Sequence, residues 1–417
     1  MFKTLRDAWK IPELRKKLMF TAMLLLIYRI VSAISLPVVD AKMVAETISA
    51  TMNSTILGLF DMMSGSALSQ ASVLALGIQP YINASIIIQL LTVAIPALER
   101  MAKEGGEEGK KKINKITRYT TVALGALLGY GYYTMLASYG LVQEPGFWSA
   151  LIAVATFTAG SSLVMWMGEQ ITEHGIGNGI SMILFANIVA GLPSLFNSLI
   201  GAGWGWGIGM GVLLLALVLF ILFINEAERR IPVQYAKRVV GRKVYGGQST
   251  NLPIKVAMSG VMPVIFAQSI CSVPATICAF AGITSGWWYE NVFSSSSWIY
   301  LVIYGLLIFF FSWFYSQIQY DPVEISNNMK KNGGFIPGFR PGKPTSDFIK
   351  KVIAKIVIFG AVYLAVVAML PMIAGSVSKT NLGIGGTSII IVVGVALETV
   401  KALEAQMLMR HYKGFLD

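Results

Sequence analysis

The sequence contains ten apolar stretches, each about long enough to cross a lipid bilayer. A bilayer-spanning helix needs about 20 apolar residues, and a soluble core does not repeat runs of that length. Hydrophobic residues make up 55% of the chain and charged residues 13%, whereas soluble domains are about a quarter charged. We therefore predict an all-α polytopic membrane protein. The predicted spans are Leu18–Val38, Leu76–Ile95, Tyr119–Leu141, Phe147–Met167, Ile180–Leu199, Trp206–Ile224, Val256–Phe280, Trp298–Ile318, Val352–Ile373 and Gly386–Val400.

The positive charges alternate with these spans. Of the 33 Lys and Arg residues, 29 fall before the first span, after the last span, or in the loops that follow the second, sixth and eighth spans, and Lys355 lies in the first turn of the ninth span. Cytoplasmic loops of membrane proteins are enriched in Lys and Arg, so these segments and both termini are predicted to be cytoplasmic. The fourth connection, Gly168–Gly179, should lie on the same side although it carries neither residue.

Ten spans divide into two halves of five, residues 1–200 and residues 201–417. An odd number of spans per half inverts the second half relative to the first, as in many transport proteins. The second span of each half carries Gly and Pro, in Leu76-Gly-Ile-Gln-Pro80 and in Gly260-Val-Met-Pro263. Broken helices in corresponding positions indicate a translocation site. Ordinary proline kinks are the alternative interpretation.

Catalytic chemistry has little support in the sequence. His174 and His411 have no His or Cys at metal-ligand spacing, and Cys271 and Cys278 share one apolar run. We expect no metal site, no cofactor and no enzymatic activity. The predicted spans contain few ionisable residues, chiefly Arg29, which disfavours an ion-coupled carrier. The two stretches that imitate a phosphate loop, Gly105–Lys110 and Gly338–Lys343, have three residues between their framing glycines where four are needed, so uphill transport would need a partner or an ion gradient.

Two predicted cytoplasmic loops, residues 226–253 and 320–351, are longer than a hairpin requires. Both mix basic residues with aromatic residues and with Gly-Pro turns. Such surfaces suit docking of an acidic protein, RNA or anionic lipid. Positive-inside charge alone is the simpler explanation.

Five stretches together resemble one family. In chain order they are Leu76–Leu90, Gly168–Ser181, Arg230–Arg238, Phe335–Lys343 and Gly385–Val393. Across essentially its whole length, the chain is similar to the bacterial SecY family, the pore subunit of the general protein-secretion channel. The resemblance implies a channel in the bacterial cytoplasmic (inner) membrane. It would pass unfolded secretory polypeptides and release signal and transmembrane helices sideways into lipid.

The resemblance also implies a central pore between the two five-helix halves, with an aliphatic ring at its waist. An apolar constriction can gate by dewetting and can close around varied peptides. The residues at the corresponding positions are Ile78, Ile82, Ile180, Leu184, Ile265 and Ile391.

A plug and a lateral gate are implied as well. Residues 56–75 are too interrupted by polar residues to span the membrane, and they resemble the family's re-entrant plug. The plug positions singled out are Phe60, Asp61, Met62, Met63, Ser64 and Gly65. The second and seventh spans resemble the gate walls, whose polar residues would hold the gate shut through weak hydrogen bonds. These are Asn83, Ser85, Gln89, Gln268 and Ser272.

The two basic loops resemble docking sites for the SecA motor ATPase and for the ribosome. The residues expected to contact these partners are Arg238, Arg242, Lys243, Arg340 and Lys343. The family implies further partners: small SecE-like and SecG-like membrane subunits, precursors with signal sequences, and membrane lipid. DNA is not expected among them.

Other functions stay open when only the residues are considered. A secondary solute carrier with inverted repeats shares the predicted topology. A membrane-embedded enzyme such as a lipid transferase would need a His, Asp or Cys constellation near one interface, and the sequence offers none. The family resemblance favours the channel.

Overall fold

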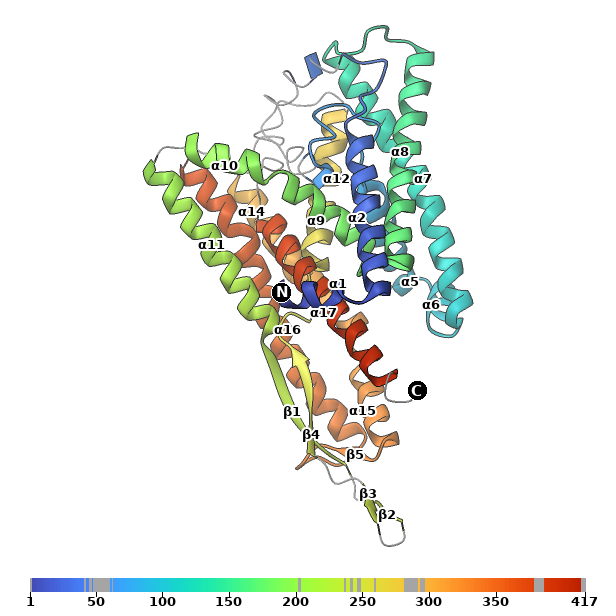
Figure 1. Ribbon diagram of the computed structural model, residues 1–417, viewed down its shortest axis with the longest axis vertical. Coiled ribbons are helices and arrows are strands. Elements are labelled where there is room, and N and C mark those ends of the chain that lie inside the picture. Colours follow the sequence, from blue (N-terminus) through green and yellow to red (C-terminus); the bar gives the residue numbers. More distant parts are fainter. Residues whose placement is uncertain are drawn as a thin grey trace.

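The apolar stretches form long helices, because backbone groups in lipid must find their hydrogen bonds within the protein. The computed structural model describes residues 2–40, 43–44, 47, 61, 63–201, 204–235, 238–240, 243–245, 249–258, 260–280, 292, 297–378 and 386–413. Figure 1 shows a bundle of helices with a narrow arm projecting from one end. The helices of the bundle are α1 (Phe2–Trp9), α2 (Pro12–Ser32), α5 (Gln79–Ala94), α6 (Pro96–Lys103), α7 (Gly106–Ser138), α8 (Phe147–His174), α9 (Gly179–Ala190), α10 (Leu192–Gly201), α11 (Trp204–Glu226), α12 (Met262–Phe280), α14 (Trp298–Gln319), α16 (Lys343–Ser378) and α17 (Gly386–Lys413).

The prediction of a polytopic helical membrane protein is confirmed. Six of the described helices are long and apolar enough to cross a membrane. A seventh candidate is the pair α5 and α6, which is bent by 105° at the break before Pro96. Helices also occupy the other predicted spans, with α12 shorter and α2 and α7 carrying charged residues. The full count of ten spans stays a prediction.

The Gly and Pro residues of the second and seventh predicted spans begin helices. Gly77 and Gly260 both adopt left-handed backbone conformations, with φ of 50° and 59°, which glycine reaches without steric cost. Three residues later, Pro80 and Pro263 lie in the first turns of α5 and α12, where the missing N–H costs nothing. The expected breaks therefore precede these helices. Pro274 is the proline that lies inside α12.

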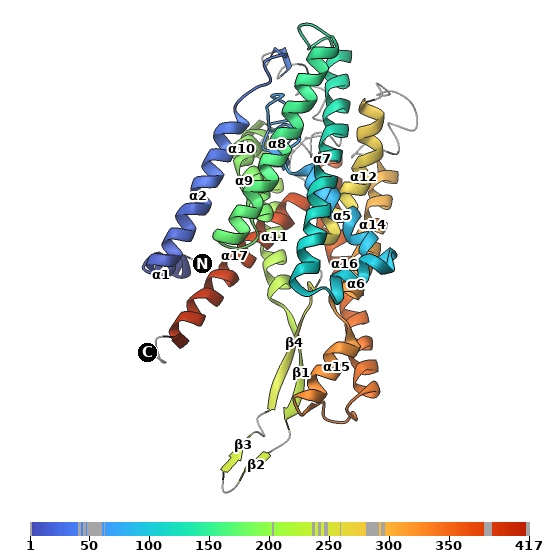
Figure 2. The same ribbon diagram turned by 90° about the vertical axis from the view of Figure 1, so that its right-hand side faces the viewer.

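The two long basic loops form a single unit. β1 (Glu228–Tyr235) pairs antiparallel with β4 (Ser249–Lys255), and β5 (Gly334–Phe335) from the other loop pairs with the free side of β1. α15 (Pro322–Lys331) and the first turns of α16 lie beside the strands (Figure 2). An apolar cluster joins all three parts: Ile231, Val233, Ile254, Met258, Met329, Ile336, Ile349, Ile353 and Val357.

Both termini lie toward the end of the bundle from which the arm projects (Figures 1 and 2). The hydroxyl of Thr4 donates to Glu404 at 3.2 Å, which ties α1 to α17. Ile176, in the fourth connection, is buried in the same small cluster as Leu14 and Leu403. The fourth connection, which carries neither Lys nor Arg, therefore lies at the same end as the termini, as the alternation of the spans predicted.

Close packing of α8 generates a stability prediction. A Cβ atom on Gly160 would collide with the carbonyl oxygen of Val73, whereas a Cβ on Gly209 of α11 would meet nothing within 4 Å. We expect Gly160→Ala to destabilise the folded protein by about 1–3 kcal/mol through overpacking. Gly209→Ala should leave stability within about 1 kcal/mol, since alanine favours helix. Thermal unfolding of the two purified variants, compared with the unsubstituted chain, checks this; equal midpoints would contradict it.

Candidate functional site

The six predicted ring residues pack into one apolar cluster at the centre of the bundle. Ile78, Ile82, Leu184 and Ile391 are buried, and Ile180 and Ile265 are partly buried against them. They come from α5, α9, α12 and α17, which belong to both halves of the chain. Ile78 occupies the N-cap of α5 and thus precedes the regular helix on which it was expected. Tertiary packing thus brings together side chains that are more than 300 positions apart in sequence.

The plug segment reaches this cluster. Met63 is 7% exposed and belongs to the same apolar cluster as the ring residues. Residues 65–78 fold as turns, in which Asp61 accepts a hydrogen bond from the backbone N–H of Ser69 at 2.7 Å. The Tyr132 hydroxyl of α7 donates to the carbonyl of Leu68. Of the predicted plug positions, Phe60 and Met62 lie outside the described residues.

Asn187 of α9 is a contact that sequence reasoning missed. Its side chain is 1% exposed, and its Nδ2 donates to the Tyr28 hydroxyl at 2.9 Å and to the Met63 carbonyl at 2.8 Å. A buried amide within an apolar span is expensive unless it is hydrogen-bonded. A lone asparagine within an apolar span indicates that a buried partner exists, but the sequence does not identify which segment supplies that partner.

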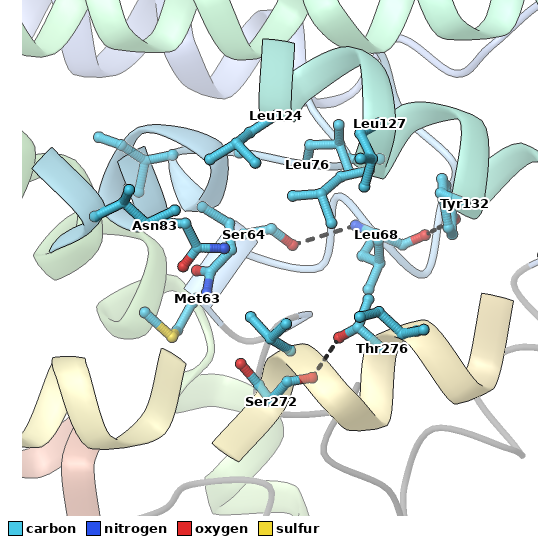
Figure 3. Close-up of a pocket in the computed structure, with 18 residues that line it drawn as sticks. Met63, Ser64, Leu68, Leu76, Asn83, Leu124, Leu127, Tyr132, Ser272 and Thr276 are labelled. Atoms are coloured by element: carbon cyan, nitrogen blue, oxygen red, sulfur yellow. Dashed lines mark hydrogen bonds between the residues drawn. The ribbon is translucent and has the colours of Figure 1, made fainter. Parts of the chain in front are cut away.

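A pocket of about 190 Å³ separates α5 from α12 at the predicted gate. Figure 3 shows Asn83 and Ser272 on opposite sides of this pocket, with Met63, Ser64 and Leu68 of the plug segment beside them. Its lining is mostly aliphatic, with α7 contributing the third wall. The residues are Met63, Ser64, Leu68, Ala75, Leu76, Gly77, Ile78, Gln79, Asn83, Ile87, Leu124, Leu127, Leu128, Tyr132, Ser272, Val273, Thr276 and Ile277.

The polar gate residues have partners other than the bonds expected between α5 and α12. Gln268 directs its Nε2 at the sulfur of Met63, 3.6 Å away, and Gln89 is hydrogen-bonded with Tyr315 of α14. The hydroxyl of Ser272 donates within its own helix, to the carbonyl of Ser269, at 2.7 Å. Ser85 is half-buried on α5.

Two gate amides keep an unsatisfied acceptor. Within the part of the chain that the structure describes, neither Asn83 Oδ1 nor Gln268 Oε1 has a hydrogen-bond partner, although both atoms are buried. A buried acceptor without a donor costs free energy. Two of the predicted gate amides therefore leave part of their hydrogen-bonding capacity unused in this structure.

Four of the five predicted docking residues lie in the arm, in β2, β3 or the segment from β5 to the start of α16. Arg340 and Lys343 are exposed beside β5, and the Arg340 carbonyl accepts a hydrogen bond from the Thr345 hydroxyl at 2.8 Å. Arg238 and Lys243 belong to β2 (Arg238–Val240) and β3 (Lys243–Tyr245), which pair at the tip of the arm (Figure 2). Arg242 lies outside the described residues.

Metal coordination has no candidate in the described part of the chain. No three His, Cys, Asp or Glu side chains there lie close enough together to hold an ion. The chemistry available at the site is instead aliphatic packing and neutral hydrogen bonding. Both are suited to moving parts, because neither demands one fixed partner.

Comparison with known proteins agrees with this geometry. Residues 72–400 match the SecY family model. The chain is 45% identical to the protein translocase subunit SecY of Streptomyces galbus, with all of both chains covered. It is 42% identical to that of Thermotoga maritima, covering 100% of this chain and 98% of the relative.

Solved structures share the fold at lower identity. One, described as the structure of a protein conducting channel, has a TM-score of 0.67 at 17% identity, with 97% of each chain covered. Another, Sec61 in the canine ribosome-channel complex from the endoplasmic reticulum, has a TM-score of 0.64 at 18% identity, again with 97% of each chain covered.

Two asparagines that differ in their partners give a prediction. Asn83→Leu removes an unpaired buried acceptor from an aliphatic pocket, so the stability of the closed protein should stay constant or rise by about 1 kcal/mol. Asn187→Leu also removes an unpaired buried oxygen, but it breaks two hydrogen bonds and leaves the Met63 carbonyl without its donor, so it should destabilise the closed protein by about 1–3 kcal/mol. Thermal unfolding in detergent measures both. A larger loss for Asn83→Leu would refute this account of the gate.

Proposed function

The chain belongs to the SecY family, and from this membership and its geometry we propose that it is a protein-conducting channel. It passes unfolded secretory polypeptides across the bacterial cytoplasmic membrane. One observation carries the proposal: aliphatic residues from four helices of both halves meet in a single cluster, against which Met63 of the plug packs. A closed polypeptide channel requires a plug that packs against an apolar constriction, and this arrangement supplies both.

The ring works without binding its substrate. Aliphatic side chains such as Ile82 and Ile391 attract one another through dispersion and the hydrophobic effect, which have no preferred direction. They can part around a peptide of any sequence and close again behind it, while the dry constriction opposes ion flow. Because α5 and α9 belong to the first half and α12 and α17 to the second, separating the halves opens the ring.

The pocket between α5, α7 and α12 supports a lateral exit for signal and transmembrane helices. Its aliphatic lining offers an apolar helix an environment similar to lipid. The unpaired oxygens of Asn83 and Gln268 mean that opening this route sacrifices few strong hydrogen bonds. An entering helix therefore competes mainly with packing contacts.

Energy is proposed to come from outside the chain, from a SecA-type ATPase or a ribosome docked on the arm. The arm stands clear of the bundle, and Arg340 and Lys343 are exposed on it (Figure 1). Two of the structural neighbours are channels in ribosome complexes. Small SecE-like and SecG-like subunits are proposed by family membership. We place the arm and both termini in the cytoplasm, following the distribution of Lys and Arg.

A secondary solute carrier is less well supported. A carrier binds its solute through charged or polar groups that converge near mid-membrane. Here the six ring positions are all aliphatic, and the buried amides beside them, Asn187 and Gln268, are directed at Met63 of the plug.

Polypeptide should touch the ring during transport. A single cysteine at Ile82, in a chain with Cys271 and Cys278 replaced by serine, should crosslink to a stalled secretory precursor that carries one cysteine. The crosslink should require ATP, SecA and a functional signal sequence. A cysteine at Leu215 is the control, since that residue is 64% exposed on the outside of α11. Equal crosslinking at both positions, or none at Ile82 in membranes that transport the precursor, would refute the ring.

Charge on the arm should matter for docking and not for folding. Arg340→Glu is expected to lower precursor transport at least about tenfold by repelling an acidic partner surface, and added salt should lessen the difference. The backbone there is held by Thr345, so the unfolding midpoint should not change. Lys401→Glu, an exposed substitution on α17, is the control. If Arg340→Glu transported precursor as fast as Lys401→Glu, Arg340 would not be part of the docking surface.

A further inference from the structure

Three consecutive backbone carbonyls of the plug each accept a hydrogen bond from a different side chain. The Met63 carbonyl accepts from Asn187 Nδ2 at 2.8 Å, and the Ser64 carbonyl accepts from the Tyr28 hydroxyl at 3.3 Å. The Gly65 carbonyl accepts from Arg29 Nη1 at 2.9 Å. None of these donors belongs to the ring, to the gate or to the arm.

The donors form a connected set. Tyr28 and Arg29 are neighbours near the end of α2, and Asn187 of α9 donates to the Tyr28 hydroxyl at 2.9 Å as well as to the plug. Tyr28 and Asn187 are each 1% exposed. Buried polar groups of this kind are expensive when unpaired, so their hydrogen-bonding capacity favours the state in which the plug is present.

The bonds fall where the plug backbone needs donors. A helical turn ends at Ser64, and the last carbonyls of a helix have no partner within it. A cation such as Arg29 is favoured near such carbonyls. Gly65 has φ of 70°, and a Cβ there would lie 2.6 Å from Arg29 Nη1 and 2.9 Å from Asn187 Oδ1. The close approach of both side chains therefore needs glycine at this position.

These contacts attach the plug to the first half of the chain. α2 and α9 both precede residue 201, whereas the contact from Gln268 of the second half ends on the Met63 thioether, a weak acceptor. When the halves separate, the stronger set stays with the first half. Parting the ring and freeing the plug are therefore different events.

We infer that Tyr28, Arg29 and Asn187 form a latch that holds the closed plug through its main chain and sets how readily it leaves. The inference rests on the proposed function, since it presumes that the plug stops a channel. Because the latch contacts carbonyl oxygens, it holds the plug whatever side chains residues 63 and 64 carry. Displacement of the plug requires these three bonds to break in addition to the packing of Met63.

Resting ion permeability tests the latch. The full chain with its partner subunits is reconstituted in vesicles loaded with a halide-quenched dye, without motor or precursor. Tyr28→Phe and Asn187→Leu should each raise iodide entry about three- to tenfold, the shift expected for loss of one or two neutral hydrogen bonds. Ser32→Ala is the matched control, because its hydroxyl bonds only within α2, to the Arg29 carbonyl, among the contacts described. Gly65→Ala should raise iodide entry by a similar factor, because the added Cβ would push away Arg29 and Asn187 while leaving the three donors unchanged.

Two further readouts separate the latch from general loosening. The double variant Tyr28→Phe with Asn187→Leu should leak less than the product of the single effects, because the two side chains share a bond. The unfolding midpoint of Tyr28→Phe should fall no further than that of Asn187→Leu, because each substitution leaves one plug carbonyl without its donor. Entry rates in Tyr28→Phe and Gly65→Ala equal to the control would overturn the latch. Failure of the unsubstituted chain to transport any precursor would instead overturn the proposed function, since the iodide assay does not depend on transport.

Discussion

Backbone inside a membrane protein must find hydrogen-bond partners within that protein, and this requirement shapes both the rigid and the movable parts of the structure. The long helices satisfy it by themselves. The turns that follow Ser64 do not, and side chains of the surrounding helices supply donors: Asn187, Tyr28 and Arg29 to three successive carbonyls, and Tyr132 to that of Leu68. A re-entrant segment is tolerated here because the surrounding helices supply hydrogen-bond donors for its carbonyl groups.

Two kinds of interaction divide the work of closing the pore. In the proposed channel, the aliphatic cluster around Ile82 and Ile391 closes the pore with contacts that have no preferred direction, so it can reform after any peptide has passed. The hydrogen bonds to the plug are directional, and they fix its position. The gate pocket lies between these two systems, and its lining includes Ile78 of the ring and Ser64 of the plug. A helix that enters the pocket therefore meets both.

The arm, on which we propose that a partner docks, is joined to the bundle through continuous structure. β1 leads from α11 and pairs with strands from both basic loops, and α16 runs without interruption from Lys343 in the arm into the membrane region. Ile349, Ile353 and Val357 of α16 pack in the same apolar cluster as the strands. A partner that docks near Arg340, as we propose, would therefore act on α16 of the second half through continuous helix.

The sequence by itself determined the helical membrane architecture, because apolar runs of bilayer length and one-sided positive charge follow directly from the solvent the chain must face. It also marked the starts of α5 and α12, since the left-handed glycine and first-turn proline are local requirements, and its motifs indicated Ile82 and its partners. Only the tertiary structure decided what Asn187 and Tyr28 contact, that Gln268 faces Met63, and that two distant loops share β1. Those outcomes depend on which segments meet in space, and hydrophobic periodicity carries no information about the partner of a single buried polar group.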